Sequence, residues 1–401
     1  MFKKLLSLTL ALLMVATLGA SMVSCSGDDG VFKFGVILLH DETSTYDKNF
    51  IEAVQRAATN LGLTEDQIVM KRDIPESDAC YEAAADLVDA GCDVIFADSF
   101  GHETFLLKAA KEFPDVEFCH ATGTMAHTEK LPNFHNAFAS IYEGRYLAGV
   151  AAGLKLNEMI ENETITAEQA KMGYVGAFTF AEVISGYTSF YLGAKSVCPS
   201  VTMDVQFTGS WYDENEEKNA AIALMDSGCV LISQHADSMG APSACEDRDV
   251  PNVSYNGSTV GSCPDTFIVS SKIDWTPYFE YICNAVMNGE TIATDWTGTI
   301  KTGSVVLSEV NTKAAAEGTQ AKLDEVKAKL VSGELKVFDT DTFTVEGEKL
   351  SSYLADVDTD PKYEKDTEAI KDGYFHESEY RSAPYFDLTV DGITLVNTNF
   401  G

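Results

Sequence analysis

The stretch QHADSMG, residues 234–240, places the residue types of a serine hydrolase side by side. A Ser-His-Asp triad is assembled from separated positions, so the adjacent His235, Asp237 and Ser238 cannot converge in that way. The sequence contains no G-x-S-x-G motif and no G-x-x-x-x-G-K-[ST] phosphate loop. In GHETFL, Leu106 stands where a zinc protease needs its second histidine. These patterns predict no enzyme and no catalytic residue.

The same stretch belongs to a segment that occurs twice. Residues 89–101 are DAGCDVIFADSFG, and residues 226–240 are DSGCVLISQHADSMG. Each copy runs from Asp through Gly-Cys and an apolar run to Asp-Ser, one apolar residue and Gly, and the second copy is two residues longer. A segment that carries catalytic residues is not usually duplicated within one chain. The repeat instead predicts a binding protein with two similar lobes and a cleft between them.

Charge and cysteine spacing exclude several classes of partner. The net charge of −34 and the pI of about 4.4 repel nucleic-acid phosphates, so no nucleic-acid partner is expected. The cysteines after Cys25 form no C-x-x-C pair, which argues against a zinc ribbon or a thioredoxin-like centre. The D-x-D-x-D run of residues 356–360 lacks an EF-hand's glycine and final glutamate, where Pro361 and Thr367 stand. We expect no metal ion and no cofactor.

The N-terminus resembles a bacterial lipoprotein signal peptide. A basic start and an apolar run over residues 5–18 lead to the sequence MVSC, which ends at Cys25. The resemblance implies a signal peptide over residues 1–24, lipidation of Cys25 and a short tether over residues 25–31. The apolar run is too short for a convincing membrane span. We therefore expect a protein held by its lipid at the extracytoplasmic face of a bacterial cell membrane.

Strand-like and helix-like segments alternate along most of the chain. The apolar run VFKFGVILLH is typical of a buried parallel strand, and the residues after Tyr46 follow helical spacing up to Gly62. This order predicts the α/β class, with parallel sheets flanked by helices and a ligand cleft between two lobes. The expected parts are lobe 1 at residues 32–145, lobe 2 at 146–271, a return segment at 272–338 that completes the lobes, and a polar region of hairpins and loops at 339–401.

Ligands of open α/β sheets bind beyond the carboxyl ends of the strands, where this chain gathers aromatic and polar residues. Such a lining suits a flat, uncharged molecule with polar edges. Asp98, which also ends a strand, is expected to cap the following helix. His40, Asp41, His120, Phe178, Ser238 and Tyr255 share this edge. The predicted ligand-binding residues are Thr45, Tyr46, Asp47, Phe50, Ser99, Phe100, Thr122, Glu182, Trp211, His235, Asp237, Asn256 and Trp275.

These residues resemble the basic membrane lipoprotein family of ABC-transporter substrate-binding proteins, including its Med-like purine-binding branch. The likeness covers about residues 34–303 and is most specific in EVISGYTSFYLGAKSVCP and TGSWYD. STYDKNF, VIFADSFG, FCHATG, YEGRYLAGVAAG, LISQHADS and SYNG also match. The resemblance implies a type I periplasmic-binding fold, no catalysis, and hinge closure on a purine nucleoside or nucleobase that is delivered to an ABC permease. We expect a monomer.

The resemblance also implies individual roles. The chain departs from the purine-binding branch at Thr43 and Ser44, where that branch carries Gly-Trp, and other branches carry Asp at the position of Asn256. A sugar or signalling molecule as ligand, a sensor without import, and a nucleoside hydrolase are the alternatives. Tyr46 and Phe50 resemble first-lobe aromatics near the base, Ser99 and Phe100 the following loop, and Glu182, Trp211, Asp237 and Asn256 the contacts of the second lobe.

Overall fold

Two β-sheets, each flanked by helices, form the frame of the protein in a computed structural model that describes residues 30–357, 362 and 364–400. The predicted signal peptide, the lipidation site Cys25, most of the tether and residues 358–361 lie outside the described residues. Residues 33–400 belong to one compact unit. Among the described residues, no helix combines the length and the apolar composition needed to cross a membrane. The α/β class is confirmed.

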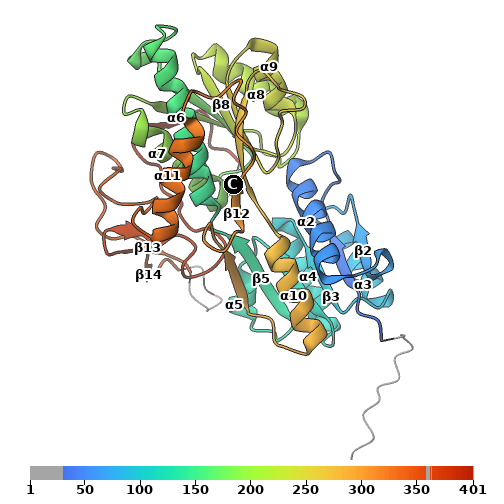
Figure 1. Ribbon diagram of the computed structural model, residues 1–401. Helices are drawn as coiled ribbons and strands as arrows, with labels where there is room; N and C mark the ends of the chain where they lie inside the picture. Colours follow the sequence, from blue (N-terminus) through green and yellow to red (C-terminus); the bar gives the residue numbers. More distant parts are fainter. Residues whose placement is uncertain (1–29, 358–361, 363, 401) are drawn as a thin grey trace, which may run out of the picture. The chain divides into compact units, whose positions relative to one another are not determined.

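The first sheet and its helices make up lobe 1, drawn mainly in blue and cyan in Figure 1. Its elements are β1 (Phe34–Ile37), α2 (Thr45–Leu61), η1 (Glu65–Gln67), β2 (Ile68–Lys71), α3 (Asp78–Asp89), β3 (Val94–Ala97), η2 (Phe100–His102), α4 (Glu103–Glu112), β4 (Glu117–Ala121), α5 (Met125–Glu129), β5 (Phe134–Ala139), α10 (Thr276–Asn288) and β11 (Asp295–Gly298). The strand order is β11-β5-β4-β3-β1-β2, with every pair parallel. Phe34 lies opposite Ile68 on one side and Val94 on the other.

The second sheet and its helices make up lobe 2. Its elements are α6 (Ile141–Glu161), η3 (Ala167–Gln169), β6 (Lys171–Gly176), α7 (Ala181–Val197), β7 (Thr202–Phe207), α8 (Glu214–Asp226), β8 (Leu231–His235), α9 (Gly240–Arg248), β9 (Asn252–Tyr255), β10 (Phe267–Ile273), β12 (Val305–Leu307), α11 (Thr319–Ser332) and β17 (Ile393–Leu395). The strand order is β12-β10-β9-β8-β6-β7-β17. Only β12 runs antiparallel to its neighbour among these described strands.

The chain passes between the lobes at three connections within residues 139–305. They join β5 to α6, β10 to α10, and β11 to β12. The polar C-terminal region holds two short antiparallel pairs: β13 (Leu354–Ala355) with β14 (Thr367–Glu368), and β15 (Ile370–Lys371) with β16 (Tyr374–Phe375). The sequence did not predict β17, which joins the edge of the lobe 2 sheet beside β7.

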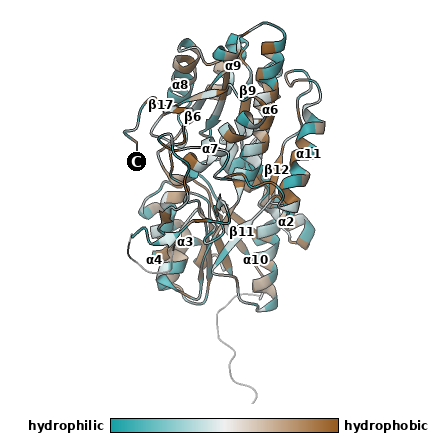
Figure 2. Ribbon diagram, turned by 90° about the vertical axis from the view of Figure 1, so that its left-hand side faces the viewer, coloured by the Kyte–Doolittle hydropathy of each residue, from teal (hydrophilic) through white to brown (hydrophobic). Residues whose placement is uncertain are grey.

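Local sequence signals explain where the site-bearing helices begin and end. The Ser44 side chain accepts a hydrogen bond from the Asp47 amide at the start of α2, and Gly62 ends the helix with a φ of 71°. The predicted stop at Gly62 is therefore confirmed. In Figure 2, helices such as α11 carry both hydrophobic and hydrophilic residues, as expected for a helix with one buried side.

The two lobes have different cores. In lobe 1, Phe50 of α2 stacks on Trp275 at a centroid distance of 4.6 Å, and both side chains are fully buried. In lobe 2, α6 and α7 pack closely against one another. A Cβ on Gly149 of α6 would lie only 1.9 Å from the carbonyl oxygen of Phe190 of α7, so the contact requires a glycine. All eight cysteines of the described residues are buried. The sequence had left their state open, and here they pack as small apolar side chains.

Candidate functional site

A small pocket lies where carboxyl ends of strands from both lobes meet. It encloses about 20 Å³, which is room for about one water molecule. This is the sheet edge at which the sequence predicted a site. The lining residues are Leu39, Tyr46, Ser99, Phe100 and Thr122 from lobe 1, and Glu182, Trp211, His235, Asp237 and Tyr255 from lobe 2.

Tyr46 enters the pocket from the first turn of α2. Its hydroxyl donates to the carbonyl oxygen of Asp98 at 2.8 Å, and its ring meets Phe50 edge-on at a centroid distance of 4.8 Å. Burial raises the pKa of Tyr46 well above its usual range. The phenol is therefore neutral and held from two sides, so it presents a fixed aromatic surface.

The loop after β3 is tied to a glutamate of the neighbouring segment. The Ser99 hydroxyl and the Gly101 amide both donate to Oε1 of Glu76, at 2.6 and 2.7 Å. The Ser99 carbonyl oxygen lies 2.7 Å from Nε2 of His120, whose pKa burial lowers to about 4, so the neutral ring donates here. Phe100 follows with 41% of its surface exposed. The loop is thus rigid up to Ser99, and Phe100 lies at the pocket mouth.

Thr122 and Asn256 each come directly after a strand, and both adopt a left-handed backbone conformation. Their φ angles are 66° and 62°, values that residues other than glycine rarely adopt and that cost free energy. Thr122 comes directly after β4 of lobe 1, and Asn256 comes directly after β9 of lobe 2. The Thr122 hydroxyl is buried and has no hydrogen-bond partner among the described residues. This hydroxyl is therefore free to bond a molecule that enters the pocket.

His235 and Glu182 form a polar pair on the lobe 2 side. Nε2 of His235 lies 3.4 Å from Oε1 of Glu182, and the imidazole packs 4.5 Å from the ring of Tyr255. Burial lowers the pKa of His235, which keeps the ring neutral at pH 7. Behind Tyr255 lies the guanidinium of Arg145, fully buried and 5.0 Å from the centroid of that ring.

Asp237 connects the two lobes through its backbone and reaches the pocket with its side chain. Its carbonyl oxygen accepts from the Thr45 amide at 3.0 Å and from the Thr45 hydroxyl at 3.3 Å. Its amide donates to the carbonyl oxygen of Trp211 at 2.9 Å. Burial, followed by the charges of Glu217 and other nearby carboxylates, raises the pKa of Asp237 well above its usual range.

Three aromatic rings form a wall beside the pocket, and we call Phe178, Phe180 and Trp211 the aromatic wall. Phe178 stacks on Phe180 at 5.1 Å and meets Trp211 edge-on at 5.0 Å. Phe180 also lies 5.2 Å from Phe100 of lobe 1. The wall therefore packs against the opposite lobe at the pocket mouth.

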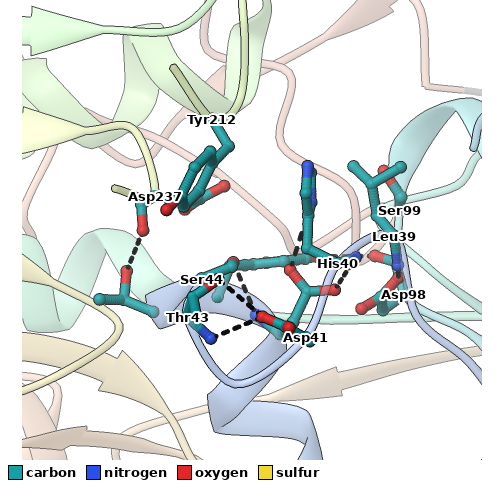
Figure 3. A network of polar contacts seen from close by, with 12 residues as sticks. Leu39, His40, Asp41, Thr43, Ser44, Asp98, Ser99, Tyr212 and Asp237 are labelled. Atoms are coloured by element: carbon teal, nitrogen blue, oxygen red, sulfur yellow. Dashed lines mark hydrogen bonds and ion pairs between the residues drawn. The ribbon is translucent and has the colours of Figure 1, made fainter. Parts of the chain in front are cut away.

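A further interlobe contact joins His40 of lobe 1 to Tyr212 of lobe 2. Their rings stack at a centroid distance of 5.3 Å, and Figure 3 shows them beside Asp237. The His40 amide donates to Oδ1 of Asp47 at 2.7 Å, and this carboxylate raises the pKa of the imidazole. Together with the Thr45 contact, this stacking holds the lobes against one another around the pocket.

Several predicted site residues lie outside the pocket lining in this structure. Phe50 and Trp275 are fully buried in the lobe 1 core beneath Tyr46. Asp47 turns back toward His40, and Thr45 is engaged with Asp237. Asn256 lies beside Asp237, and its amide lowers the pKa of that carboxyl.

Two neighbouring strand ends differ from what the sequence suggested. Asp98 does not cap a helix: its Oδ1 accepts from the Leu39 amide at 3.1 Å, while Ser99 and His102 occupy the cap positions of η2 and α4. The expected capping role was therefore wrong. Leu39 itself lines the pocket and was missed, because an apolar residue after an apolar strand carries no sign of a site. Its position two residues after β1, beyond the carboxyl end of that strand, was the available signal.

No group of three or more His, Cys, Asp or Glu side chains within the described ranges could hold a metal ion. The acidic side chains near the pocket are engaged with other residues instead. Glu182 faces His235, and Glu76 binds the Ser99 loop. What the pocket offers is therefore aromatic surface, carboxyl oxygens and hydroxyls.

The chain matches proteins of known family across both lobes. Residues 34–341 match the family described as Bmp, ABC transporter substrate-binding protein PnrA-like. A purine-binding protein of Brucella abortus is 32% identical over 283 residues, which cover 67% of this chain and 76% of that protein. A Haloferax volcanii protein, whose name assigns it provisionally to glucose binding by an ABC transporter, is 31% identical over 271 residues, covering 66% of this chain and 65% of that protein.

Solved structures agree on the fold. The solute-binding protein of an ABC transporter from Conexibacter woesei superposes with a TM-score of 0.62 at 21% identity, covering 76% of this chain and 98% of that one. A structural similarity of this kind shows the fold, so the predicted type I periplasmic-binding fold is confirmed. With a family match that spans both sheets and the connections between them, this chain belongs to the Bmp family of PnrA-like ABC transporter substrate-binding proteins.

Proposed function

We propose that the protein binds a purine nucleoside or nucleobase in the interlobe pocket and delivers it to an ABC importer. The observation that carries this proposal is the composition of the lining. Tyr46 and Trp211 supply aromatic surface, Glu182 and Asp237 supply carboxyl oxygens, and none of the ten described lining residues is Lys or Arg. A purine is flat, carries N–H donors on its edge and has no charge, so it fits all three features.

The same lining disfavours anionic ligands. A phosphorylated nucleoside would bring negative charge into a pocket whose described lining contains no Lys or Arg to balance it. The ligand should therefore be the neutral nucleoside or base. Ser99, Thr122 and His235 would supply the remaining polar contacts, with Tyr46 and Trp211 stacking on the ring.

Binding would proceed by hinge motion at the three interlobe connections. A volume of about 20 Å³ is far too small for a purine, so the lobes must separate, or the side chains must shift, before the ligand enters. Closure then forms contacts from Tyr46 of lobe 1 and from Asp237 of lobe 2 to one molecule. The ligand stabilises the closed state because only that state makes both sets of contacts.

Two relatives bear on the identity of the ligand. The Brucella abortus protein is named for purine binding, whereas the Haloferax volcanii protein is named for glucose. A sugar would also use aromatic rings and carboxylates, so glucose is the second candidate ligand. In either case the protein would act without catalysis, and purified protein should release no base from inosine.

Membrane attachment is a separate part of the proposal. The sequence before Cys25 has the features of a lipoprotein signal peptide, and the proposed lipid on Cys25 would hold a monomeric protein at the extracytoplasmic face beside its permease. Cys25→Ser should move the protein from the membrane fraction to the soluble fraction. Continued membrane association of that variant would contradict lipid anchoring.

A thermal-shift panel tests the ligand. Purified protein, unfolded and refolded to remove carried-over ligand, would be heated with adenosine, guanosine, inosine, adenine, hypoxanthine, xanthine and glucose. A ligand at about 100 times its Kd should add about 2.7 kcal/mol to the free energy of unfolding, a shift of several degrees. A shift with purines alone supports the proposal. A shift with glucose alone would replace it with sugar binding.

A further inference from the structure

The C-terminal tail, residues 393–400, lies outside the family match yet reaches the neighbourhood of the pocket. Strand β17 adds to the edge of the lobe 2 sheet, with Ile393 opposite Met203 and Leu395 opposite Val205. Figure 2 shows β17 and the C-terminal end on the side of lobe 2 where β6 and α8 lie. The tail runs parallel to β7, so its last residues emerge at the same sheet edge as the pocket.

Beyond β17 the tail contacts the last residue of β7 and the loops that follow β6 and β7. Asn397 bonds Phe207 twice, because its Oδ1 accepts from the Phe207 amide at 2.8 Å and its Nδ2 donates to the Phe207 carbonyl at 2.9 Å. The carbonyl oxygen of Phe400 accepts from the amide and the hydroxyl of Thr179, at 2.7 and 2.9 Å. The Phe400 ring covers Gly209, where a Cβ would lie 2.5 Å from the ring.

The two contacted loops carry the aromatic wall. Thr179 lies between Phe178 and Phe180, and Gly209 lies two residues before Trp211. Phe178 packs on Trp211 at 5.0 Å, so a movement of either loop would displace the other. Trp211 lines the pocket directly. A chain of contacts therefore runs from the tail through both loops to the pocket surface.

We infer that the tail is part of the binding site's support, and that Asn397 and Phe400 act as positioning residues for the aromatic wall. The inference rests on the proposed function, since it assumes that Trp211 meets the ligand. A strand that only covered a sheet edge would need the pairing with β7 and nothing more. Here the bonds continue past β17, first to Phe207 at the very end of β7 and then, beyond β7, to Thr179 in the loop between β6 and α7.

The test compares two asparagines of the tail in the full-length protein. Asn397→Ala removes both bonds to Phe207, whereas Asn399→Ala changes an exposed residue two positions away. Acrylamide quenching of Trp211 fluorescence, isolated by subtracting the same variants in a Trp211→Phe background, reports the position of the wall without any ligand. We expect Asn397→Ala to increase this quenching and Asn399→Ala to leave it unchanged.

Ligand affinity is the second readout. For the tightest-binding purine of the panel above, we expect Asn397→Ala to raise the Kd about tenfold, as for the loss of well-made, part-buried hydrogen bonds. Asn399→Ala should retain the wild-type Kd. If Asn397→Ala does not fold, Thr179→Val removes only the hydroxyl bond to Phe400 and should raise the Kd about threefold.

Unchanged quenching and unchanged Kd in both Asn397→Ala and Thr179→Val would overturn the inference, even if Asn397→Ala lowered the melting temperature. That result would make the tail an edge strand only. Failure of the wild-type protein to bind any purine is a different outcome: it would overturn the proposed function, while the quenching comparison would still decide whether the tail positions Trp211.

Discussion

The two copies of the duplicated segment, residues 89–101 and 226–240, adopt the same strand-to-helix plan but put their shared aspartate to different use. Asp98 turns back into lobe 1 and accepts from the Leu39 amide. Asp237 lines the pocket, and its carbonyl bonds Thr45 of the opposite lobe. One copy therefore holds its own lobe together at this point, and the other meets its partner lobe.

The two additional residues of the second copy account for the difference. Asp98 follows directly after β3, whereas Ala236 separates Asp237 from the end of β8, which is one residue longer than β3. Two residues of extended chain carry the second aspartate about 7 Å farther along the strand direction. The second loop thus reaches across the sheet edge, while the first ends against its neighbouring strand.

Each copy also uses a glutamate to brace its loop, but in opposite surroundings. Glu76 is exposed and accepts from Ser99 and Gly101. Glu217 is fully buried and accepts from the Ser238 amide at 3.2 Å. In both copies the loop is therefore held by a glutamate from outside the copy, and the free-energy cost of losing that contact should differ between the exposed and the buried glutamate.

The largest difference should come from the glycine that ends each copy. A Cβ at Gly240 would lie 2.2 Å from the backbone carbonyl of Glu214, which cannot move without shifting α8. The three atoms nearest to a Cβ at Gly101 all belong to the exposed Glu76 side chain, whose carboxyl end can rotate away while its own Cβ, at 2.8 Å, must shift slightly. Gly240→Ala should lower the free energy of unfolding by about 3 kcal/mol and Gly101→Ala by about 1 kcal/mol. Urea unfolding measures both, and equal losses would contradict the comparison.

Alanine at the aspartates should separate binding from stability. Asp237→Ala should weaken purine binding by about 2 kcal/mol, since the side chain reaches the pocket. Asp98→Ala should instead lower the free energy of unfolding by about 2 kcal/mol, because the Leu39 amide loses its partner. Calorimetric titration and urea unfolding on both variants check this crossed pattern. A loss of affinity in Asp98→Ala as large as that in Asp237→Ala would break it.

The glutamates should differ in pH dependence. Burial raises the pKa of Glu217 to about 7, while an unfolded glutamate titrates near 4.3. Between these values the folded protein keeps a proton that the unfolded chain releases. The raised pKa therefore stabilises the fold at low pH, and this contribution falls by about 1.4 kcal/mol per pH unit as the pH rises through the window.

The free energy of unfolding should be measured at pH 5 and at pH 7. Between these two values it should fall less in Glu217→Gln than in the wild type, because the variant lacks the one proton that Glu217 contributes. The slope will not vanish, because burial also raises the pKa values of Glu143 and Glu377 to about 7. Glu76→Gln makes the same exchange at the exposed glutamate and is the matched control. An unaltered slope in Glu217→Gln would show that its carboxyl is not the buried acid described above.

The smallest effect should arise at the residue before each glycine. Phe100 packs against Phe180 of the opposite lobe, so Phe100→Ala should weaken ligand binding by about 0.5–1 kcal/mol through the lost aromatic pair. Met239, its counterpart, does not line the pocket, and Met239→Ala should leave affinity unchanged. The two Kd values measure this directly. Equal affinities in both variants would indicate that the ring pair at the mouth does not stabilise closure.

Local sequence patterns predicted much of the fold. The helical spacing up to Gly62 and the apolar run at β1 predicted the first β-α unit, since Gly62 adopts the left-handed φ that ends α2. The repeat of Asp-Ser at two strand ends predicted two lobes. Local patterns did not predict β17, because its partner β7 lies about 190 residues away and strand pairing over that separation leaves no local signal.

The sequence by itself determined the α/β class, the two similar lobes and the sheet edge where side chains gather, because hydrophobic periodicity and chain order are local properties. Only the tertiary structure decided which side chains reach the pocket. Tyr46 and Phe50 lie one helical turn apart on α2, yet the first lines the pocket and the second stacks on Trp275 in the core. A turn of helix advances about 5.4 Å, so the depth of a residue depends on how the helix seats against its sheet. That seating is set by packing between distant segments.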